Sequence, residues 1–189
     1  DQTVKASGIE VTGEETVNVG ETVSLTATVK PVNAGNKEVT WKVTSGNQIV
    51  SVDDQGTVKG LNKGTAKIIA VSKENENVKS KEFVIKVLAP TKSIQILDSP
   101  ITLEQEKTYS ISRTIDSSLT KGYIVTPNNT DDKMEWSSND TNVVSVTMNG
   151  NRADLKAVAA GTATLTVKAT SGVTASIQVT VIPKKISVT

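Results

Sequence analysis

Two adjacent pairs of acidic residues are the first groups in this 189-residue sequence that suggest chemistry. Asp53 and Asp54 lie in the segment DDQG, and Asp131 and Asp132 lie in TDDK. Carboxylate oxygens are ligands that Ca²⁺ prefers, but neither segment has the alternating acidic spacing and the distal Glu of an EF-hand loop. Neighbouring carboxylates more commonly form a turn. We therefore expect turns here, and we predict no metal site and no cofactor.

The sequence contains no histidine and no cysteine. Histidine is the commonest general base, and both residues are the usual ligands of zinc. An active site would have to use carboxylates, lysine, serine or tyrosine alone. Disulfides are excluded, whereas an isopeptide bond between Lys and Asn side chains on facing strands stays an open alternative. We predict that the chain is not an enzyme.

Aromatic side chains are few, and two of them, Trp41 and Trp136, occupy matching places in the sequence. Exposed tryptophans can hold sugars by stacking, whereas a tryptophan between two sheets belongs to the core. Apolar neighbours two positions away, such as Val39, favour the core for both. Tyr123 follows Lys121 in a segment that lacks a counterpart elsewhere in the chain. These two residues are the candidates for contact with a ligand.

The sequence repeats itself at an offset of about 95 residues. Three motifs return in the same order, namely VTWKV (39–43) as MEWSS (134–138), IVSV (49–52) as VVSV (143–146), and KGTAKI (63–68) as AGTATL (160–165). A unit of about 90 residues has the usual size of a domain. We predict one domain over residues 1–89 and a second over 90–183. Residues 184–189 (KKISVT) resemble 91–97 and predict the start of a truncated third repeat.

Apolar and polar residues alternate along both repeats, as in 22–29 and 162–170. A period of two indicates strands with one buried face, and the turn signals between them recur every eight to twelve residues. The fold class predicted is all-β, with two tandem immunoglobulin-like β-sandwiches. In the first repeat the expected strands are 8–12, 16–19, 22–29, 38–44, 49–52, 57–60, 65–72 and 81–88.

Charge and hydropathy exclude two classes of partner. Twenty-one basic and twenty acidic residues give a net charge of +1, and no basic stripe is available to follow a phosphate backbone. No apolar run approaches the roughly 18 to 20 residues that span a bilayer. We therefore expect no nucleic acid partner and no membrane insertion.

Three segments carry a resemblance to a known family: VNVGETVSLTATVKP (17–31), SVDDQGTVKGLNKGTAKI (51–68) and, in the second repeat, AAGTATLTV (159–167). With the two tryptophan motifs, they make the chain resemble two copies of the group 2 bacterial immunoglobulin-like (Big) domain. The second repeat departs from this pattern by about ten additional residues, DSSLTKGYIV (116–125), placed after Ile115. The departure predicts either a hairpin or an added loop.

The resemblance implies an extracellular setting, on a bacterial cell surface or in a secreted protein, such as an adhesin or a protein of the cell wall or S-layer. It implies a non-catalytic structural spacer or display segment that supports adhesion. Its partners would be neighbouring immunoglobulin-like or functional domains of the same parent protein. The short junction at 89–91 predicts an elongated, semi-rigid pair. The alternative is a ligand-binding module that holds cell-wall glycan or a host protein through the additional residues of the second repeat.

Overall fold

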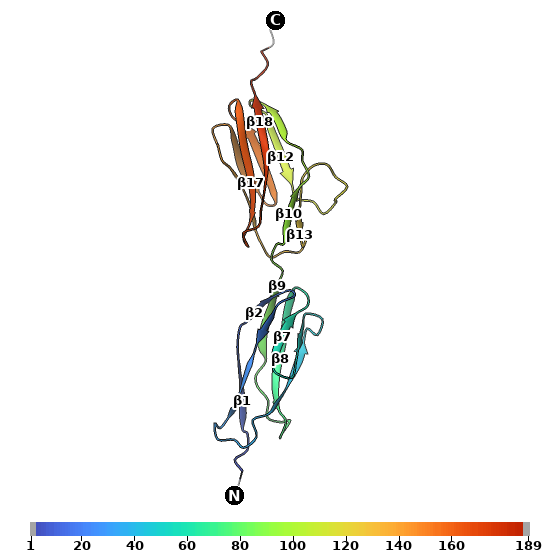
Figure 1. Ribbon diagram of the computed structural model, residues 1–189, viewed down its shortest axis with the longest axis vertical. Coiled ribbons are helices and arrows are strands. Elements are labelled where there is room, and N and C mark those ends of the chain that lie inside the picture. The colour runs from blue at the N-terminus through green and yellow to red at the C-terminus, as the bar shows by residue number, and fades with distance from the viewer. Residues whose placement is uncertain (1–2, 187–189) are drawn as a thin grey trace. The chain divides into compact units, whose positions relative to one another are not determined.

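A computed structural model of the chain describes residues 3–186, and within that range it contains strands, turns and loops but no helix. The chain divides into two compact units, which we call the first domain (Asp1–Ala89) and the second domain (Pro90–Thr189) (Figure 1). The all-β class predicted from the alternation is confirmed. The expected start of a third repeat ends in residues 187–189, which lie outside the described range.

The first domain consists of nine strands in three pairing groups. A four-stranded sheet has the order β2-β9-β8-β5, a three-stranded sheet has the order β3-β7-β6, and β1 pairs with β4. β2 runs parallel to β9, while the other pairs are antiparallel. The strands are β1 (Gly8–Thr12), β2 (Thr16–Asn18), β3 (Thr22–Ser24), β4 (Thr26–Lys30), β5 (Val39–Ser45), β6 (Val50–Val52), β7 (Thr57–Gly60), β8 (Gly64–Ser72) and β9 (Phe83–Leu88).

The second domain repeats this topology strand for strand. Its sheets have the orders β11-β18-β17-β14 and β12-β16-β15, and β10 pairs with β13. β1 to β9 therefore correspond to β10 to β18. The strands are β10 (Ser93–Ile96), β11 (Ile101–Glu104), β12 (Thr108–Ser112), β13 (Tyr123–Thr126), β14 (Met134–Ser138), β15 (Val144–Asn149), β16 (Arg152–Ala157), β17 (Gly161–Ala169) and β18 (Thr174–Ile182).

Alternation along the strands produces the buried faces. In β17 the apolar positions Ala163, Leu165 and Val167 are at most 1% exposed, while the threonines between them are at least partly exposed. Each large aliphatic side chain buried in this way contributes about 1.5–3 kcal/mol. The apolar face that the alternation over residues 162–170 predicts to be buried is the buried face in the structure.

The segment expected as one strand over 22–29 is two strands. β3 pairs with β7, and β4 pairs with β1. The change of partner occurs at Leu25, whose N–H donates to the Gly56 carbonyl at 2.9 Å instead of joining either ladder. Periodicity could not reveal this division, because the alternation of side chains continues unbroken through the crossing.

The hydrophobic core differs between the domains. In the second domain the buried residues form one cluster, which contains both Tyr123 and Trp136. In the first domain they separate into a larger cluster around Ile68 and Ile85 and a small one around Val29. The first domain therefore lacks a side chain that joins its two clusters.

The turn after β2, and its counterpart after β11, adopts the same positive-φ conformation with different residues. Gly20 has φ +87° and donates its N–H to Gly60, and Glu106 has φ +73° and donates its N–H to Ala157. Residues other than glycine rarely adopt this left-handed conformation, because the Cβ crowds the backbone. The Glu106 carboxylate pairs with Lys184 at 2.5 Å, just after β18. Val-Gly-Glu-Thr (19–22) of the first repeat is thus replaced by the different residues of 103–108 in the second, while the turn keeps its positive φ and its backbone hydrogen bond.

Replacing Gly20 by alanine is expected to lower the unfolding free energy of the first domain by about 1–2 kcal/mol. A Cβ at Gly20 would meet no atom within 4 Å, so backbone conformation alone causes the loss. Gly8 is the matched control, since it has equally open surroundings and no positive φ. Gly8→Ala should leave stability unchanged or raise it by up to about 1 kcal/mol. Hydrogen exchange of first-domain amides measures both, and equal effects of the two substitutions would contradict the prediction.

Candidate functional site

The additional residues of the second domain lie between β12 and β13. Strand pairing fixes their place, because β13 aligns Val125 with Ile94 and Tyr123 with Ile96, as β4 aligns Val29 and Ala27 with β1. Tyr123 therefore corresponds to Ala27, and Val125 to Val29. The prediction that the additional residues are 116–125 is wrong. We call residues 113–122 the insertion; it is a loop placed where the chain changes partner, so it interrupts no ladder.

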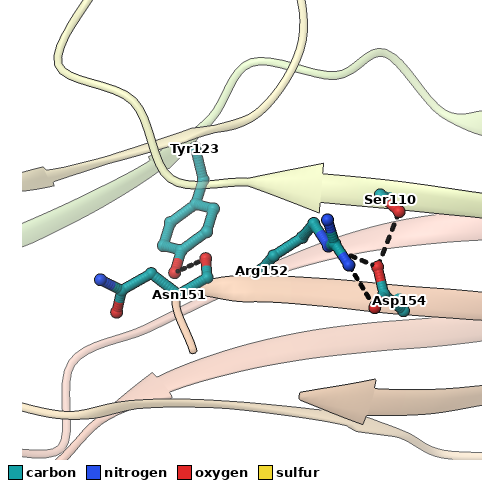
Figure 2. Close-up of polar contacts among 5 residues, drawn as sticks. All are labelled: Ser110, Tyr123, Asn151, Arg152 and Asp154. Carbon is teal, nitrogen blue, oxygen red and sulfur yellow. Dashed lines mark hydrogen bonds and ion pairs between the residues drawn. The ribbon is translucent and has the colours of Figure 1, made fainter. Parts of the chain in front are cut away.

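Tyr123 is fully buried in the core of the second domain. Its hydroxyl donates to the backbone carbonyl of Asn151 at 2.9 Å (Figure 2). Its ring meets the Trp136 indole edge to face, with centroids 5.4 Å apart and planes at 76°. Burial raises the pKa of Tyr123. The expectation that Tyr123 is an exposed contact is wrong, because the residue belongs to β13 and faces inward.

Lys121 is exposed at the end of the insertion and lies beside Tyr109. Its Nζ is 5.7 Å from the centroid of the Tyr109 ring, within the range of a cation–π contact. Asp98 holds both elements together, because it accepts a hydrogen bond from the Tyr109 hydroxyl and another from the Gly122 N–H at 2.7 Å. The two candidate ligand contacts are therefore separated, with Lys121 at the surface and Tyr123 in the core.

A groove of about 360 Å³ lies beside Lys121 and is lined by Asp98, Leu103, Tyr109 and Thr120, among others. Partial burial and the negative charge of Asp98 raise the pKa of Tyr109 to about 12. The phenol is therefore neutral at physiological pH, and its hydroxyl is already engaged as the donor of the hydrogen bond to Asp98. The groove offers an ammonium, hydroxyls and a small apolar wall. These groups can hold a polar ligand, and they include no activated nucleophile.

The insertion also exposes two aliphatic side chains that the sequence analysis missed. Ile115 is 77% exposed and Leu119 is 48% exposed. Asp116 lies between them and accepts hydrogen bonds from the N–H of Ser118 at 2.9 Å and its hydroxyl at 2.6 Å, which defines the turn at the tip. The sequence contained a signal for this exposed pair, because two aliphatic residues occur in a loop otherwise rich in Ser and Thr. The insertion thus presents an apolar tip beside a polar groove.

The two tryptophans differ in their surroundings. Trp136 is 6% exposed, and its indole nitrogen is the only buried side-chain nitrogen or oxygen among residues 3–186 that lacks a hydrogen-bond partner. Trp41 packs against the larger core cluster of the first domain but is only partly buried. The structure therefore places Trp136 in the core and Trp41 at its margin.

One residue of each acidic pair, Asp53 and Asp132, accepts hydrogen bonds that stabilise a turn or join two segments. Asp53 accepts hydrogen bonds from the N–H groups of Gln55 at 3.0 Å and Thr57 at 2.8 Å, which closes the β6–β7 turn. Asp132 accepts hydrogen bonds from the Thr91 N–H at 2.8 Å and from the Ser171 hydroxyl. It ties the segment before β10 to the β17–β18 turn. In the part of the chain that the structure describes, no group of three or more acidic residues is placed to hold a metal ion.

The Asp132 tie predicts a pH dependence of the second domain. Partial burial alone would raise the pKa of Asp132, but the hydrogen bonds from Ser171 and Thr91 outweigh it and hold the pKa below its usual value. A carboxyl whose folded pKa is depressed stabilises the fold above the unfolded pKa, near 3.9, and loses this contribution as the pH falls through the folded pKa. We expect Asp132→Asn to lower stability at pH 7 by about 1 kcal/mol. Acid unfolding followed by circular dichroism should show a smaller difference between variant and parent below pH 3.9, and a constant difference would contradict the prediction.

A Ser–Asp–Arg cluster lies on the exposed face of β12 and β16 (Figure 2). Asp154 accepts hydrogen bonds from the Ser110 hydroxyl at 2.7 Å and contacts Arg152 Nε at 2.8 Å. Arg152 and then Ser110 hold the pKa of Asp154 below its usual value. A carboxylate stabilised in this way is a poor base for activating the serine. The cluster is an ion pair within β16 that also accepts a hydrogen bond from β12, not a nucleophilic site.

Residues 3–186 contain no helix that could span a membrane.

Comparison with curated proteins finds two partial relatives. One is a 3-O-alpha-D-galactosyl-alpha-L-arabinofuranosidase of Bifidobacterium longum subsp. longum, 41% identical over 70 residues, which are 37% of this chain and 6% of that protein. The other is an uncharacterized protein of Clostridium acetobutylicum, 28% identical over 162 residues, which are 84% of this chain and 15% of that protein. The chain thus spans a small part of the length of either relative.

Several solved structures resemble the chain at low sequence identity. Extracellular domains 3–5 of Drosophila OTK match with a TM-score of 0.50 and 15% identity, covering 95% of this chain and 63% of that one. A fragment of intimin, solved in complex with the intimin-binding domain of its translocated receptor, matches with a TM-score of 0.47 and 17% identity, covering 94% and 64%. Domains 4 and 5 of the S-layer protein SbsC match with a TM-score of 0.38 and 16% identity, covering 95% and 100%.

The model of the bacterial Ig-like domain (group 2) matches the chain twice, over residues 5–83 and 91–181. The two matches fall one in each domain. The first contains β1 to β8 and ends at the first residue of β9, and the second contains β10 to β17 and all of β18 except its last residue. The chain therefore belongs to the group 2 bacterial Ig-like family and carries two copies of its domain in tandem.

Proposed function

We propose that the chain is a non-catalytic spacer and display segment of a bacterial surface or secreted protein. One observation carries the proposal: two domains with separate cores are joined by only the four residues between β9 and β10, Ala89–Lys92. Thr91 in this junction is 5% exposed and is bonded to Asp132. A short junction that is partly fixed to one domain restricts bending. Serial domains of this kind extend whatever they carry.

Small-angle X-ray scattering tests this proposal. The parent chain should give the pair-distance distribution of an elongated particle with two lobes. A variant with a Gly/Ser linker inserted after Ala89 should give a broader distribution of lobe separations, because the added residues act as a flexible coil. A parent chain that scatters as a compact particle, or that is unchanged by the linker, would refute the spacer role.

The domain boundaries follow from the same proposal. We propose that residues 1–89 and 90–183 are the repeating units, and that residues 184–189 begin a further unit. The resemblance of residues 184–189 to 91–97, which open the second domain, supports it. The parent protein would then contain neighbouring domains of this kind. A catalytic domain elsewhere in such a parent is compatible with the non-catalytic role, as the partial similarity to the glycosidase of Bifidobacterium longum suggests.

The second candidate function is binding of a cell-wall glycan or a host protein through the insertion. The exposed pair Ile115 and Leu119 and the groove beside Lys121 favour it. Deleting residues 113–122 would leave one residue between Ile111 and Tyr123, as in the first domain between Leu25 and Ala27, and would preserve the core strand β13.

Binding to cell-wall preparations and to host-cell surfaces should be measured for the parent, this deletion and Ile115→Ser/Leu119→Ser. Loss of binding in both variants, with retained folding by circular dichroism, supports binding through the insertion. Equal binding by all three chains would exclude the insertion as the contact.

A further inference from the structure

The partly buried Trp41 lines a groove of about 410 Å³ in the first domain. Its counterpart Trp136 is covered by the Tyr123 ring. The position of Tyr123 is taken by Ala27 in the first domain, as the pairings Ile96–Tyr123 and Val11–Ala27 show. Ala27 also lines the groove. The missing aromatic ring therefore leaves the indole of Trp41 accessible from one side and separates the two core clusters of this domain.

A second difference enlarges the groove. In the second domain the β15–β16 hairpin continues past Val146 through Asn149, and Met148 packs against the core. In the first domain β6 ends at Val52, and the chain returns through a tighter turn. In the second domain the longer hairpin and Tyr123 both help to cover the core around the indole, and the first domain has neither.

The tight turn places polar groups beside the indole. A Cβ on Gly56, which has φ +84°, would lie 2.7 Å from Trp41 Cζ2, so the glycine lets the turn lie directly against the ring. Asp54 and Gln55 precede it and line the groove. Within residues 3–186, neither side chain has a hydrogen bond or an ion pair. The Asp53 side chain fixes this turn, so the turn places these two residues beside the indole before any ligand binds.

The other polar groups that line the groove are Thr26 and the ion pair of Glu38 with Lys73, at 3.6 Å. The carboxylates of Asp54 and Glu38 and the ammonium of Lys73 give the groove a net negative charge, which disfavours an anionic ligand. The arrangement fits an uncharged ligand that has one apolar face for the indole and several hydroxyls for carboxylate and amide oxygens. The volume lies within the range of about 300–1,000 Å³ typical of small-molecule sites.

We infer that this groove binds a neutral saccharide, with one sugar ring stacked on Trp41 and its hydroxyls bonded to Asp54 and Gln55. The inference goes beyond the proposed spacer role and is independent of binding through the insertion, because the groove lies in the first domain. The site would let the segment bind polysaccharide in addition to acting as a spacer.

The indole N–H resonances of the full chain provide the test. The parent is titrated with tri- and tetrasaccharides of neutral hexoses, pentoses and N-acetylhexosamines at millimolar concentration. Trp41→Phe assigns the two indole signals. At least one saccharide is expected to shift the Trp41 signal while the signal of the buried Trp136 stays in place.

Three variants then locate the site. Ala27→Tyr supplies the ring found in the second domain and is expected to weaken binding by about tenfold or more by obstructing the groove. Asp54→Ala/Gln55→Ala changes only a surface turn, so it keeps the site testable if Ala27→Tyr does not fold, and is expected to weaken binding by about tenfold through lost hydrogen bonds. Lys168→Ala changes an exposed residue of β17 in the other domain, outside both grooves, and is the control, with unchanged affinity expected.

Two results would overturn the inference. One is a Trp41 signal that no saccharide of the panel shifts, whether or not it responds to unstructured peptides. The other is a shift that persists with unchanged affinity in the Asp54/Gln55 variant.

Discussion

Replacing Trp136 by alanine is expected to lower the unfolding free energy of the second domain by about 3–5 kcal/mol. Trp136 is 6% exposed, and its neighbours in the same cluster include Leu155, Leu165 and Val167, each at most 1% exposed. A side chain so enclosed leaves a cavity that strand-bound neighbours cannot fill. The substitution also removes the edge-to-face contact with Tyr123.

Native-state hydrogen exchange measures this loss separately in each domain. Amides of β17 and β18 should exchange faster by the factor that corresponds to the lost free energy, while amides of β8 and β9 should be unaffected. Trp41→Ala is the matched comparison and should cost less in its own domain, because Trp41 is only partly buried. A loss below about 1 kcal/mol for Trp136→Ala, or an equal loss for the two tryptophans, would contradict the different burial of the two indoles.

Replacing Tyr123 by alanine is expected to cost the second domain about 3–5 kcal/mol, the range for a buried aromatic residue. The ring is fully buried and joins β13 to the rest of the core. Tyr123→Phe keeps the ring and removes only the hydroxyl that donates to Asn151, and this should cost about 1 kcal/mol. The same exchange experiment measures both variants. If Tyr123→Ala cost no more than Tyr123→Phe, the ring would not be a core element.

A double-mutant cycle separates the contact between the rings from the burial of each ring. Tyr123→Ala combined with Trp136→Ala should destabilise by less than the sum of the single losses. The expected coupling is about 0.5–1.5 kcal/mol, the range for an aromatic pair beyond its buried area. The corresponding cycle of Ala27→Gly with Trp41→Ala should give a coupling closer to zero, because no ring covers Trp41 from that position.

The candidate site could be predicted only in part from the sequence. The presence of additional residues in the second repeat followed from the spacing of motifs, and Lys121 was correctly placed among them. Their limits were not predictable, because Ile115 and Ile111 both satisfy the alternation of the preceding strand. Only the pairing of Ile96 with Tyr123 shows that the insertion ends at Gly122. The groove beside Lys121 likewise depends on Asp98, which reaches Tyr109 and Gly122 from the segment after β10.

The sequence by itself determined the all-β class, the duplication and most strand positions. These features arise from local rules: side chains alternate along an extended backbone, and turns need particular residues. Only the tertiary structure decided that Trp136 is covered while Trp41 borders a groove, and that Tyr123 faces inward. The covering of an indole depends on a residue on another strand, Tyr123 or Ala27, and that strand is brought to the indole by non-local pairing. Residues in the two repeats with the same local pattern therefore acquire different exposure once their strands are assembled.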